Sequence, residues 1–399
     1  MRVLLAATST LPDRMGGSER VIWHLARGLV ARGHEPRILV PRLRRDLPRA
    51  SEVEGIAIFR YEDPFHSFAT LYLPSVQLAR RAIRTSVHTW RPDVVHAHHG
   101  IAGLAGALAG AGPRCYTFHG PWHLEFLYEV VNRREMPWLK RSTRSLWVPV
   151  KAALASRIER AAITRSERVI ALSRFSMTQL AEIHGVAGPR VRLIPGGVDL
   201  KRFTPTIDRR AARLRLGLPP DGPLLLSVRR LVPRVGLEVL LQSLTALPGV
   251  TLVIGGSGWL RPRLERLAAE HHISDRVRCT GFIDDEDLPR YYHAADLVVL
   301  PSVALEGFGL ITLEALACGT PVVATAEGGA SDVLGPFEPS WLADEATPEA
   351  LARVISRVLD RAAADPTVRE RCRAHAEAYS WDRAAREYEE IYRSLSGAK

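Results

Sequence analysis

The stretch that decides the fold is residues 296–323, DLVVLPSVALEGFGLITLEALACGTPVV. It opens with a short apolar run, which is typical of a strand covered on both faces. Residues 309–319 have the spacing of a helix, and Gly319 with Pro321 just beyond is a typical helix end. The pattern therefore predicts a strand, then a loop that carries Glu306, and then a helix that carries Glu314 in its first two turns.

Strand and helix patterns alternate in this way along most of the chain. Strand-like runs occur at 2–8, 36–41, 93–98 and 114–120, and apolar residues at helical spacing fill 18–34. We interpret the polar, basic stretch 201–223 as the best candidate for a linker, with a short helix at most, after which the alternation restarts. The patterns predict an α/β protein with two doubly wound, Rossmann-like domains, 1–203 and 204–379, and a last helix over 380–399 that Ser380 caps.

Composition limits the function classes. The chain has 399 residues, of which 46% are hydrophobic, and a formal net charge of +11, which allows anionic partners such as nucleic acid, lipid or phosphorylated substrates. The apolar run in MRVLLAATST is too short for a secretory signal, so we expect a cytoplasmic protein. The cysteines contain no C-x-x-C pair, which argues against a disulfide framework or a zinc knuckle; they are Cys115, Cys279, Cys318 and Cys372.

Part of the basic charge is concentrated in residues 131–160, which hold eight basic and two acidic side chains. Pro137 and Pro149 interrupt the segment, which excludes one continuous membrane-surface helix. Its stripe of apolar residues predicts a core-facing side; the stripe consists of Val150, Leu154, Ile158 and Ala161. A solvated basic face and a peripheral contact with the anionic inner face of a membrane both remain open, and we expect no nucleic-acid partner.

The entrance of the helix near residue 309 is a candidate anion site. The backbone N–H groups of residues 307–310 and the positive end of the helix dipole would face a ligand there, and Gly307 and Gly309 would let it approach closely. A phosphate at this entrance, with Glu314 one turn deeper beside a hydroxyl, would suit a nucleotide. The alternative is that Glu306 is an ordinary acid at a helix N-terminus and Glu314 is solvated.

Residues 306–334, with two glutamates separated by seven residues, resemble the signature of the retaining nucleotide-sugar glycosyltransferases of family 4, which have the GT-B fold. Other motifs agree with it: GGSER (16–20), YTFHG (116–120), IPGGVDL (194–200), LSVRRLVPRVGLEVLL (226–241), GGSGWLRPRLE (255–265) and the stretch 380–395. The resemblance implies two Rossmann-like domains facing across a cleft. The first would bind the acceptor and the second the donor, and the last helix would pack back on the first domain.

The resemblance also implies roles for individual residues. Glu306 would bind hydroxyls of the donor sugar near the anomeric centre, Arg229 would bind the diphosphate, and His119 would reach the donor sugar or stabilise charge at the reacting carbon. Glu314 would bind the ribose. The other implied donor-binding residues are Gly16, Gly17, Arg234, Gly256, Gly258, Gly307, Phe308, Gly309 and Leu310.

No metal and no cofactor are expected. No carboxylate or cysteine near HAHHG (96–100) completes a metal site, although His98 or His99 suits the lining of a ligand site. The D-x-D at 285–287 opens a helix, where acids are favoured by the dipole. The glycines at 255–258 do not form the G-x-G-x-x-G of a dinucleotide site.

One position departs from the family pattern, because Val235 stands where a phosphate-binding Lys is usual. Arg234 or Arg230 could substitute, or the charge could come from elsewhere. We expect retaining transfer of a hexosyl group from a UDP-sugar to a hydroxyl of a glycan, glycolipid or small molecule. GDP-mannose is the alternative donor. A sugar-nucleotide epimerase of similar fold, or a non-catalytic binder of nucleic acid or membrane, are rival hypotheses.

Overall fold

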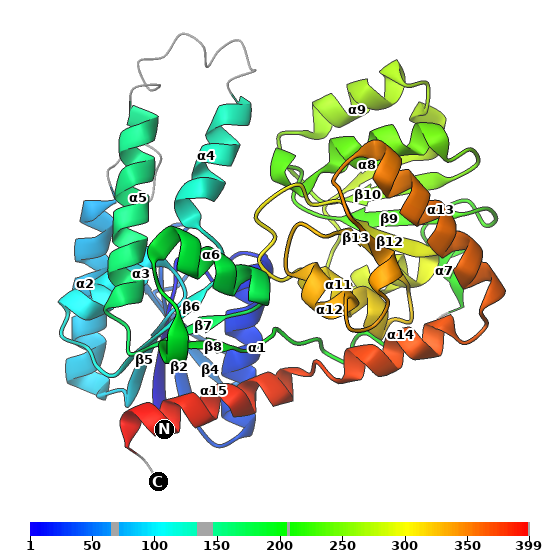
Figure 1. Cartoon of the computed structure of the whole chain (residues 1–399). Helices are drawn as coiled ribbons and strands as arrows, with labels where there is room; N and C mark the ends of the chain where they lie inside the picture. The colour runs from blue at the N-terminus through cyan, green and yellow to red at the C-terminus, as the bar shows by residue number, and fades with distance from the viewer. Residues whose placement is uncertain (65–71, 134–146, 206–207, 398–399) are drawn as a thin grey trace. The chain divides into compact units, whose positions relative to one another are not determined.

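The computed structural model describes residues 1–64, 72–133, 147–205 and 208–397 (Figure 1). The chain forms two compact units: Met1–Gly196 with Trp381–Lys399, here called unit 1, and Gly197–Ser380, here called unit 2. The domain limits predicted from the sequence, 203/204 and 379/380, lie near these divisions.

In its described residues, unit 1 contains an eight-stranded sheet in the order β3-β4-β2-β1-β5-β6-β7-β8. Neighbouring strands are parallel except for the β3–β4 pair. Their carboxyl ends therefore lie at one edge, which is where ligands of such sheets bind. The strands are β1 Arg2–Ala6, β2 Glu35–Pro41, β3 Ala50–Val53, β4 Ile56–Tyr61, β5 Val94–Ala97, β6 Arg114–Phe118, β7 Arg168–Ala171 and β8 Val191–Leu193.

Helices cover both faces of this sheet. Alternate residues of β1 point to opposite sides, so that Leu4 packs with α2, α3 and α5 while Leu5 packs with α1 and α15. Both faces are dry, which explains the continuous apolar strands. The helices are α1 Gly17–Ala31, α2 Leu73–Trp90, α3 Gly100–Leu108, α4 Trp122–Arg133, α5 Trp147–Thr164, α6 Arg174–His184 and α15 Trp381–Ser396.

The C-terminal helix α15 packs on unit 1, as the sequence predicts, against α1 and β5 (Figure 1). Gly28 of α1 permits the close approach, because a Cβ there would lie 2.5 Å from the Cβ of Ala385. A buried polar network also joins α15 to the sheet: His96 Nδ1 lies 2.6 Å from the Tyr392 hydroxyl, and His96 Nε2 lies 2.8 Å from Thr117 Oγ1. Each of these groups thereby gains the partner that burial requires.

Unit 2 is a second doubly wound unit, with a six-stranded parallel sheet in the order β11-β10-β9-β12-β13-β14 in its described residues. The strands are β9 Leu224–Val228, β10 Thr251–Gly255, β11 Val277–Gly281, β12 Leu297–Leu300, β13 Val322–Thr325 and β14 Leu342–Ala343. The helices are α7 Arg209–Arg215, α8 Leu237–Ser243, α9 Arg261–Glu270, α10 Leu288–Ala294, α11 Leu310–Ala317, α12 Ala330–Leu334, α13 Pro348–Ala364 and α14 Val368–Glu377.

The stretch 201–223 contains a short helix, α7, as expected, but its interpretation as a linker is wrong, because the stretch belongs to unit 2. Arg213 of α7 is 3% exposed, donates to the backbone oxygens of Ala294 and Gly222, and pairs with Asp296 at 2.6 Å. A polar, basic sequence can therefore be part of the core when each donor of a guanidinium finds an acceptor. This segment is an integral part of unit 2.

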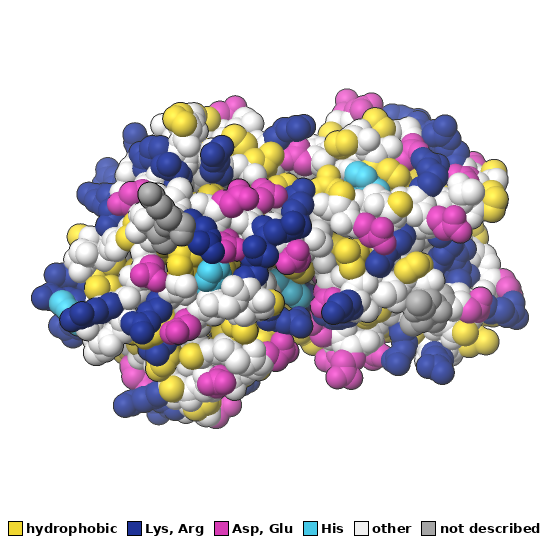
Figure 2. Space-filling view, turned by 90° about the horizontal axis from the view of Figure 1, so that it is seen from below, with side chains coloured by type: hydrophobic (Ala, Val, Ile, Leu, Met, Phe, Trp, Pro, Cys, Tyr) yellow, Lys and Arg dark blue, Asp and Glu magenta, His cyan; other side chains and the backbone are white. Residues whose placement is uncertain are grey.

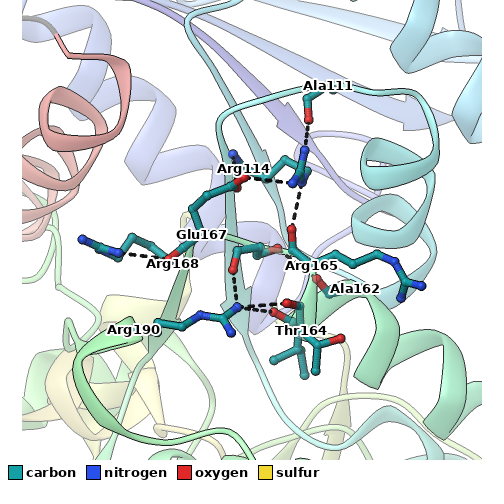
Figure 3. A network of polar contacts seen from close by, with 10 residues as sticks. Ala111, Arg114, Ala162, Thr164, Arg165, Glu167, Arg168 and Arg190 are labelled. Atoms are coloured by element: carbon teal, nitrogen blue, oxygen red, sulfur yellow. Dashed lines mark hydrogen bonds and ion pairs between the residues drawn. The ribbon is translucent and has the colours of Figure 1, made fainter.

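Several arginines brace the amino ends of β6 and β7, at the edge of the unit 1 sheet opposite to its carboxyl ends (Figure 3). Arg114 pairs with Glu167 at 2.8 Å and donates to the backbone oxygen of Arg165, and Arg190 donates to the backbone oxygen of Thr164 at the end of α5. Cationic donors at a helix C-terminus satisfy its last carbonyls. On the face in Figure 2, basic and acidic side chains are interspersed.

The prediction that Val150 belongs to the core-facing side of α5 is wrong, because Val150 is 47% exposed, whereas Ile158 of the same predicted stripe is buried. The buried face is one position away and includes Val148, Lys151 and Glu159. Because that face includes two charged side chains, a search for apolar residues at helical spacing did not identify it.

Residues 134–146 lie outside the described part of the chain, so the expected membrane contact through 131–160 stays a prediction. Within the described residues, no helix combines the length and the apolar character needed to span a bilayer.

Replacing Tyr392 with Phe should lower the free energy of unfolding by about 1–3 kcal/mol, because His96 Nδ1 would then be buried without its partner. Urea unfolding of the full chain measures this change. Glu390→Gln, on the exposed side of the same helix, is the matched control and should leave the unfolding midpoint in place. Equal midpoints for the Tyr392→Phe variant and the unmodified protein would contradict the role given to this network.

Candidate functional site

The loop between β12 and α11 has the layout that the sequence predicts. Glu306 lies on the loop, Gly307 and Phe308 follow it, and Gly309 is the N-cap of α11 with φ +76°. That left-handed conformation is costly for residues other than glycine, which explains Gly309 at the turn. Leu310 is the first helical residue, and this helix N-terminus lies at the carboxyl end of the sheet. Of the first-turn N–H groups, that of Thr312 donates to the Gly309 oxygen at 2.8 Å.

Arg229 follows β9 directly, and its guanidinium forms an ion pair with Glu306. The two side chains are only 7% and 14% exposed. Ser302, which sequence reasoning missed, accepts from Arg229 Nη2 at 3.3 Å and donates to Glu306 Oε2 at 3.2 Å. Arg229 Nη1 is buried and makes no hydrogen bond within the described residues. One donor of this guanidinium therefore has no acceptor within the described residues, which is unusual for a buried polar group.

Two opposing effects set the pKa of Glu306. Burial raises it, but attraction to Arg229 and Arg234, with hydrogen bonds from Arg229 and Ser302, more than offsets burial and holds the pKa below its usual range. Glu306 is therefore a carboxylate at neutral pH and can accept hydrogen bonds only.

Glu314 lies on α11, is 5% exposed, and accepts a hydrogen bond of 2.7 Å from the hydroxyl of Tyr292 on α10. Tyr292 is fully buried and was not identified from the sequence, because nothing in its local pattern distinguishes it from a core tyrosine. Glu306 and Glu314 thus have different partners, and within these contacts they do not form a carboxyl pair.

The loops after β9 and β10 approach each other backbone to backbone. Gly256 has φ +124°, and a Cβ there would lie 1.9 Å from the backbone oxygen of Arg229; a Cβ at Gly258 would lie 2.3 Å from that of Leu231. These glycines therefore position the loop that carries Arg229. The direct contact of Gly256 and Gly258 with the nucleotide-sugar donor, which the resemblance implies, stays a prediction.

Arg234 and Arg230 are the two arginines that could supply the positive charge of the Lys that is usual at position 235. Val235 is 2% exposed and belongs to the core of unit 2. Its neighbour Arg234 donates through Nη1 to the backbone oxygen of Leu305 at 3.1 Å, and its charge lowers the pKa of Glu306. Arg234 is therefore near the ion pair, whereas Arg230 has an exposed side chain.

Unit 1 has a pocket of about 120 Å³ at the carboxyl ends of β1, β5 and β6, here called the unit-1 pocket. His98 and His99, at the end of β5, and His119, at the end of β6, all belong to its lining. His98 Nδ1 lies 3.1 Å from His119 Nε2. Burial lowers the pKa of His119 to about 4 and that of His98 well below its usual value, so both rings are neutral at pH 7.

The β1–α1 loop closes one side of this pocket. Gly16 is the N-cap of α1 and Gly17 its first residue, so Ser18 lies inside the first turn. Ser18 donates to Glu19 Oε2 at 2.9 Å, and Ser9 donates to Glu19 Oε1 at 2.5 Å. A Cβ at Gly16 would lie 2.4 Å from that carboxylate, so this glycine leaves room for Glu19.

Glu159 of α5 also lines the unit-1 pocket, and it was not identified from the sequence. It is 2% exposed, accepts from the backbone N–H of Trp122 at 3.2 Å, and lies 3.3 Å from His184 Nε2. Burial raises its pKa, but interactions with His123 and His184 outweigh burial and lower it overall. Its position inside an apolar helix face is the signal that could have identified it, because a buried carboxylate needs a reason.

In the described part of the chain, no group of three or more His, Cys, Asp or Glu side chains is arranged to hold a metal ion. His96 is bound by Tyr392 and Thr117 in the network below the pocket. Asp285 and Asp287, at the start of α10, pair with Arg202 and Arg290 respectively.

Gly256→Ala should destabilise the protein by at least about 2 kcal/mol, because its methyl group would overlap the Arg229 carbonyl and force the β9 loop to move. Thermal unfolding measures the loss. Gly249→Ala is the matched control: Gly249 also has positive φ, but a Cβ there meets nothing within 4 Å, so only backbone strain is added. Equal losses for the two variants would contradict the steric argument.

Arg229→Met should destabilise the protein by about 3 kcal/mol at neutral pH, because the Glu306 carboxylate would stay buried without its main partner. In the unmodified protein the pKa of Glu306 is lower when folded, so the stabilisation is present above the unfolded-state pKa and is lost only as the pH falls through the folded-state pKa. In the variant, burial dominates and the folded-state pKa becomes the higher one.

The deficit of Arg229→Met should therefore shrink when the pH is lowered from about 7.5 to about 5, where Glu306 takes up a proton. Urea midpoints at both pH values test the sign. Arg230→Met, which removes an exposed cation from the next position, should show little deficit at either pH. A deficit that grows on acidification would rule out this account of the ion pair.

Comparison with known proteins agrees with this geometry. The family described as Glycosyltransferase Family 4 matches residues 15–202, and Glycosyl transferases group 1 matches 208–379. A D-inositol 3-phosphate glycosyltransferase from Xylanimonas cellulosilytica is 33% identical over 94% of this chain and 91% of its own, and one from Salinispora tropica is 31% identical over 94% and 80%.

Solved structures share the fold. A sucrose-phosphate synthase from Thermosynechococcus elongatus superposes with a TM-score of 0.84 and 26% identity, covering 100% of both chains. The Anabaena protein HepE, solved with UDP-glucose, superposes with a TM-score of 0.73 and 22% identity over 99% of this chain and 100% of its own. With two parallel-sheet units and relatives matched over nearly their whole length, the chain belongs to family 4 of the glycosyltransferases and has the GT-B fold.

Proposed function

We propose that this glycosyltransferase moves a hexosyl group from a UDP-sugar to a hydroxyl of a glycan, glycolipid or small molecule, with retention at the anomeric carbon and without a metal ion. The observation that carries the proposal is the buried Arg229–Glu306 pair beside the N-terminus of α11. It puts a fixed cation, a carboxylate and the positive end of a helix dipole within one loop system of unit 2.

The donor would use these groups in separate roles. Arg229 Nη1 and the first-turn N–H groups of α11 would bind diphosphate oxygens, since charge-assisted bonds to phosphate are the strong ones. Glu306, an acceptor only, would bind sugar hydroxyls, and Glu314 would bind the ribose. His119 would act near the reacting carbon from unit 1.

In the reaction, the bond between the anomeric carbon and the diphosphate oxygen breaks, and a bond to the acceptor oxygen forms on the same face of the sugar. The acceptor proton goes to the departing diphosphate, whose growing charge Arg229 stabilises. These cationic and N–H groups supply the charge stabilisation that a metal would otherwise give. The crystallised relative HepE with UDP-glucose supports the choice of uridine; GDP-mannose is the alternative donor.

Calorimetric titration with UDP, GDP and ADP, with and without EDTA, tests the donor assignment. We expect one nucleotide, UDP, to bind equally well in both conditions and to bind Glu314→Ala about tenfold more weakly, through loss of charge-assisted hydrogen bonds. Glu349→Ala, an exposed glutamate on α13, is the control. Absence of nucleotide binding by the folded protein would overturn the proposal.

Turnover gives an independent test. Arg229→Ala should reduce turnover by a factor of about 10² to 10³, the usual cost of losing one group that stabilises developing charge. Nuclear magnetic resonance of the product measures the anomeric configuration. Full turnover in the Arg229→Ala variant, or an inverted product, would contradict the mechanism.

A further inference from the structure

The unit-1 pocket contains one buried polar atom that lacks a partner. His98 is 4% exposed and lines the pocket, and its Nε2 makes no hydrogen bond within the described residues. Buried nitrogens of this kind normally bind a protein group, water or a ligand. Its other nitrogen, Nδ1, is already used by His119. Because His98 also belongs to the pocket lining, this nitrogen is a candidate to bind a ligand there.

The two histidines present complementary hydrogen-bonding groups. Both rings are neutral, so each carries one N–H and one lone pair, and the contact of 3.1 Å between His98 Nδ1 and His119 Nε2 uses one proton and one lone pair. The two outer nitrogens must then be one donor and one acceptor, whichever tautomer is present. A hydroxyl group, which donates and accepts, matches this arrangement, whereas a fully ionised phosphate can only accept.

The charge of the pocket lining points the same way. Glu125 and Glu159 belong to the lining, and among its described residues there is no Lys or Arg. The buried Glu159 has a pKa below its usual value, so it is a carboxylate at neutral pH. A phosphate ester would meet like charge with no Lys or Arg in the described lining, and such repulsion is strong where water is excluded. The basic side chains that give the chain its net charge of +11 therefore lie outside the described lining of this pocket.

We infer that the unit-1 pocket binds an uncharged, hydroxyl-bearing ring of the acceptor through His98 and His119, and that Glu159 disfavours a phosphate ester there. This inference rests on the proposed transferase function, because it is that function which makes unit 1 the acceptor unit. It specifies the acceptor class that the general proposal leaves open. The donor's own sugar has the same chemistry, and the experiment must separate the two sources.

The test uses the full chain with ¹⁵N-labelled histidines, whose ring signals report ligands at His98 and His119. Matched pairs are titrated without nucleotide: myo-inositol with its 3-phosphate, and glucose with glucose 6-phosphate. We expect at least one neutral compound to shift both rings and to bind at least about tenfold more tightly than its ester. Equal or tighter binding of the esters, or no shift with either member of any pair, would overturn the inference.

Variants assign the cause. Glu159→Gln should reduce the preference to about threefold or less, because the carboxylate charge is removed while its size is kept. Glu125→Gln provides a second variant at the lining, should Glu159→Gln fail to fold. Glu167→Gln, the same change at the opposite edge of the sheet (Figure 3), should keep the full preference. An unchanged preference in both pocket variants would refute the role of the carboxylates.

Separate outcomes identify which proposal fails. Shifts caused by UDP-glucose but by no free neutral sugar would assign the pocket to the donor and refute the acceptor inference. Binding of a neutral sugar in the pocket, with no nucleotide bound in the calorimetric titration, would remove the transferase proposal and leave the ligand class of the pocket standing.

Discussion

The feature on which the rest of the structure depends is the parallel pairing of strands that are covered on both faces. Two neighbouring parallel strands need a crossover connection, which is a helix here except between β2 and β4, where it is the antiparallel strand β3. The loops that lead from parallel strands into helices therefore lie at one end of the sheet. In unit 1 this brings Ser9, His98 and His119 around one pocket. In unit 2 it brings Arg229, from the loop after β9, to Glu306, from the loop after β12. Residues far apart in sequence become neighbours without any local signal.

The position of α15 follows from the same need to cover a sheet. Of the described helices, α2, α3, α5 and α6 contribute to the core on one face of the unit 1 sheet, and α1 and α15 contribute to the core on the other face. Tyr388 and Tyr392 are among the most buried side chains of the chain, and their hydroxyls bond to Thr117 and His96. His96 and His98 are two residues apart at the end of β5, and their ring centroids are 4.2 Å apart. Because Tyr392 of the C-terminal helix bonds to His96, this helix also supports the part of the pocket that His98 lines.

The two candidate sites have opposite electrostatic character. The unit 2 site has a buried guanidinium with one donor that lacks an acceptor within the described residues, whereas the unit-1 pocket has neutral histidines and carboxylates. The positive net charge of the chain does not predict either property. Many arginines satisfy backbone carbonyls or pair with acids, as Arg114, Arg190 and Arg213 do. A guanidinium used in this way contributes to net charge but is not available to bind a ligand.

The local sequence pattern was sufficient to predict the strand, loop and helix from β12 to α11. The apolar strand, the glycine at the start of the helix and the helix end are each encoded within a few residues. The family resemblance, the α/β class and the return of the last helix to unit 1 could also be predicted. Only the tertiary structure revealed Ser302 and Tyr292 as partners of the two glutamates, Glu159 as a pocket residue, and α7 as part of a core rather than a linker. Burial and partner identity depend on contacts between distant segments, and a buried, satisfied charge has the same local sequence as a solvated one.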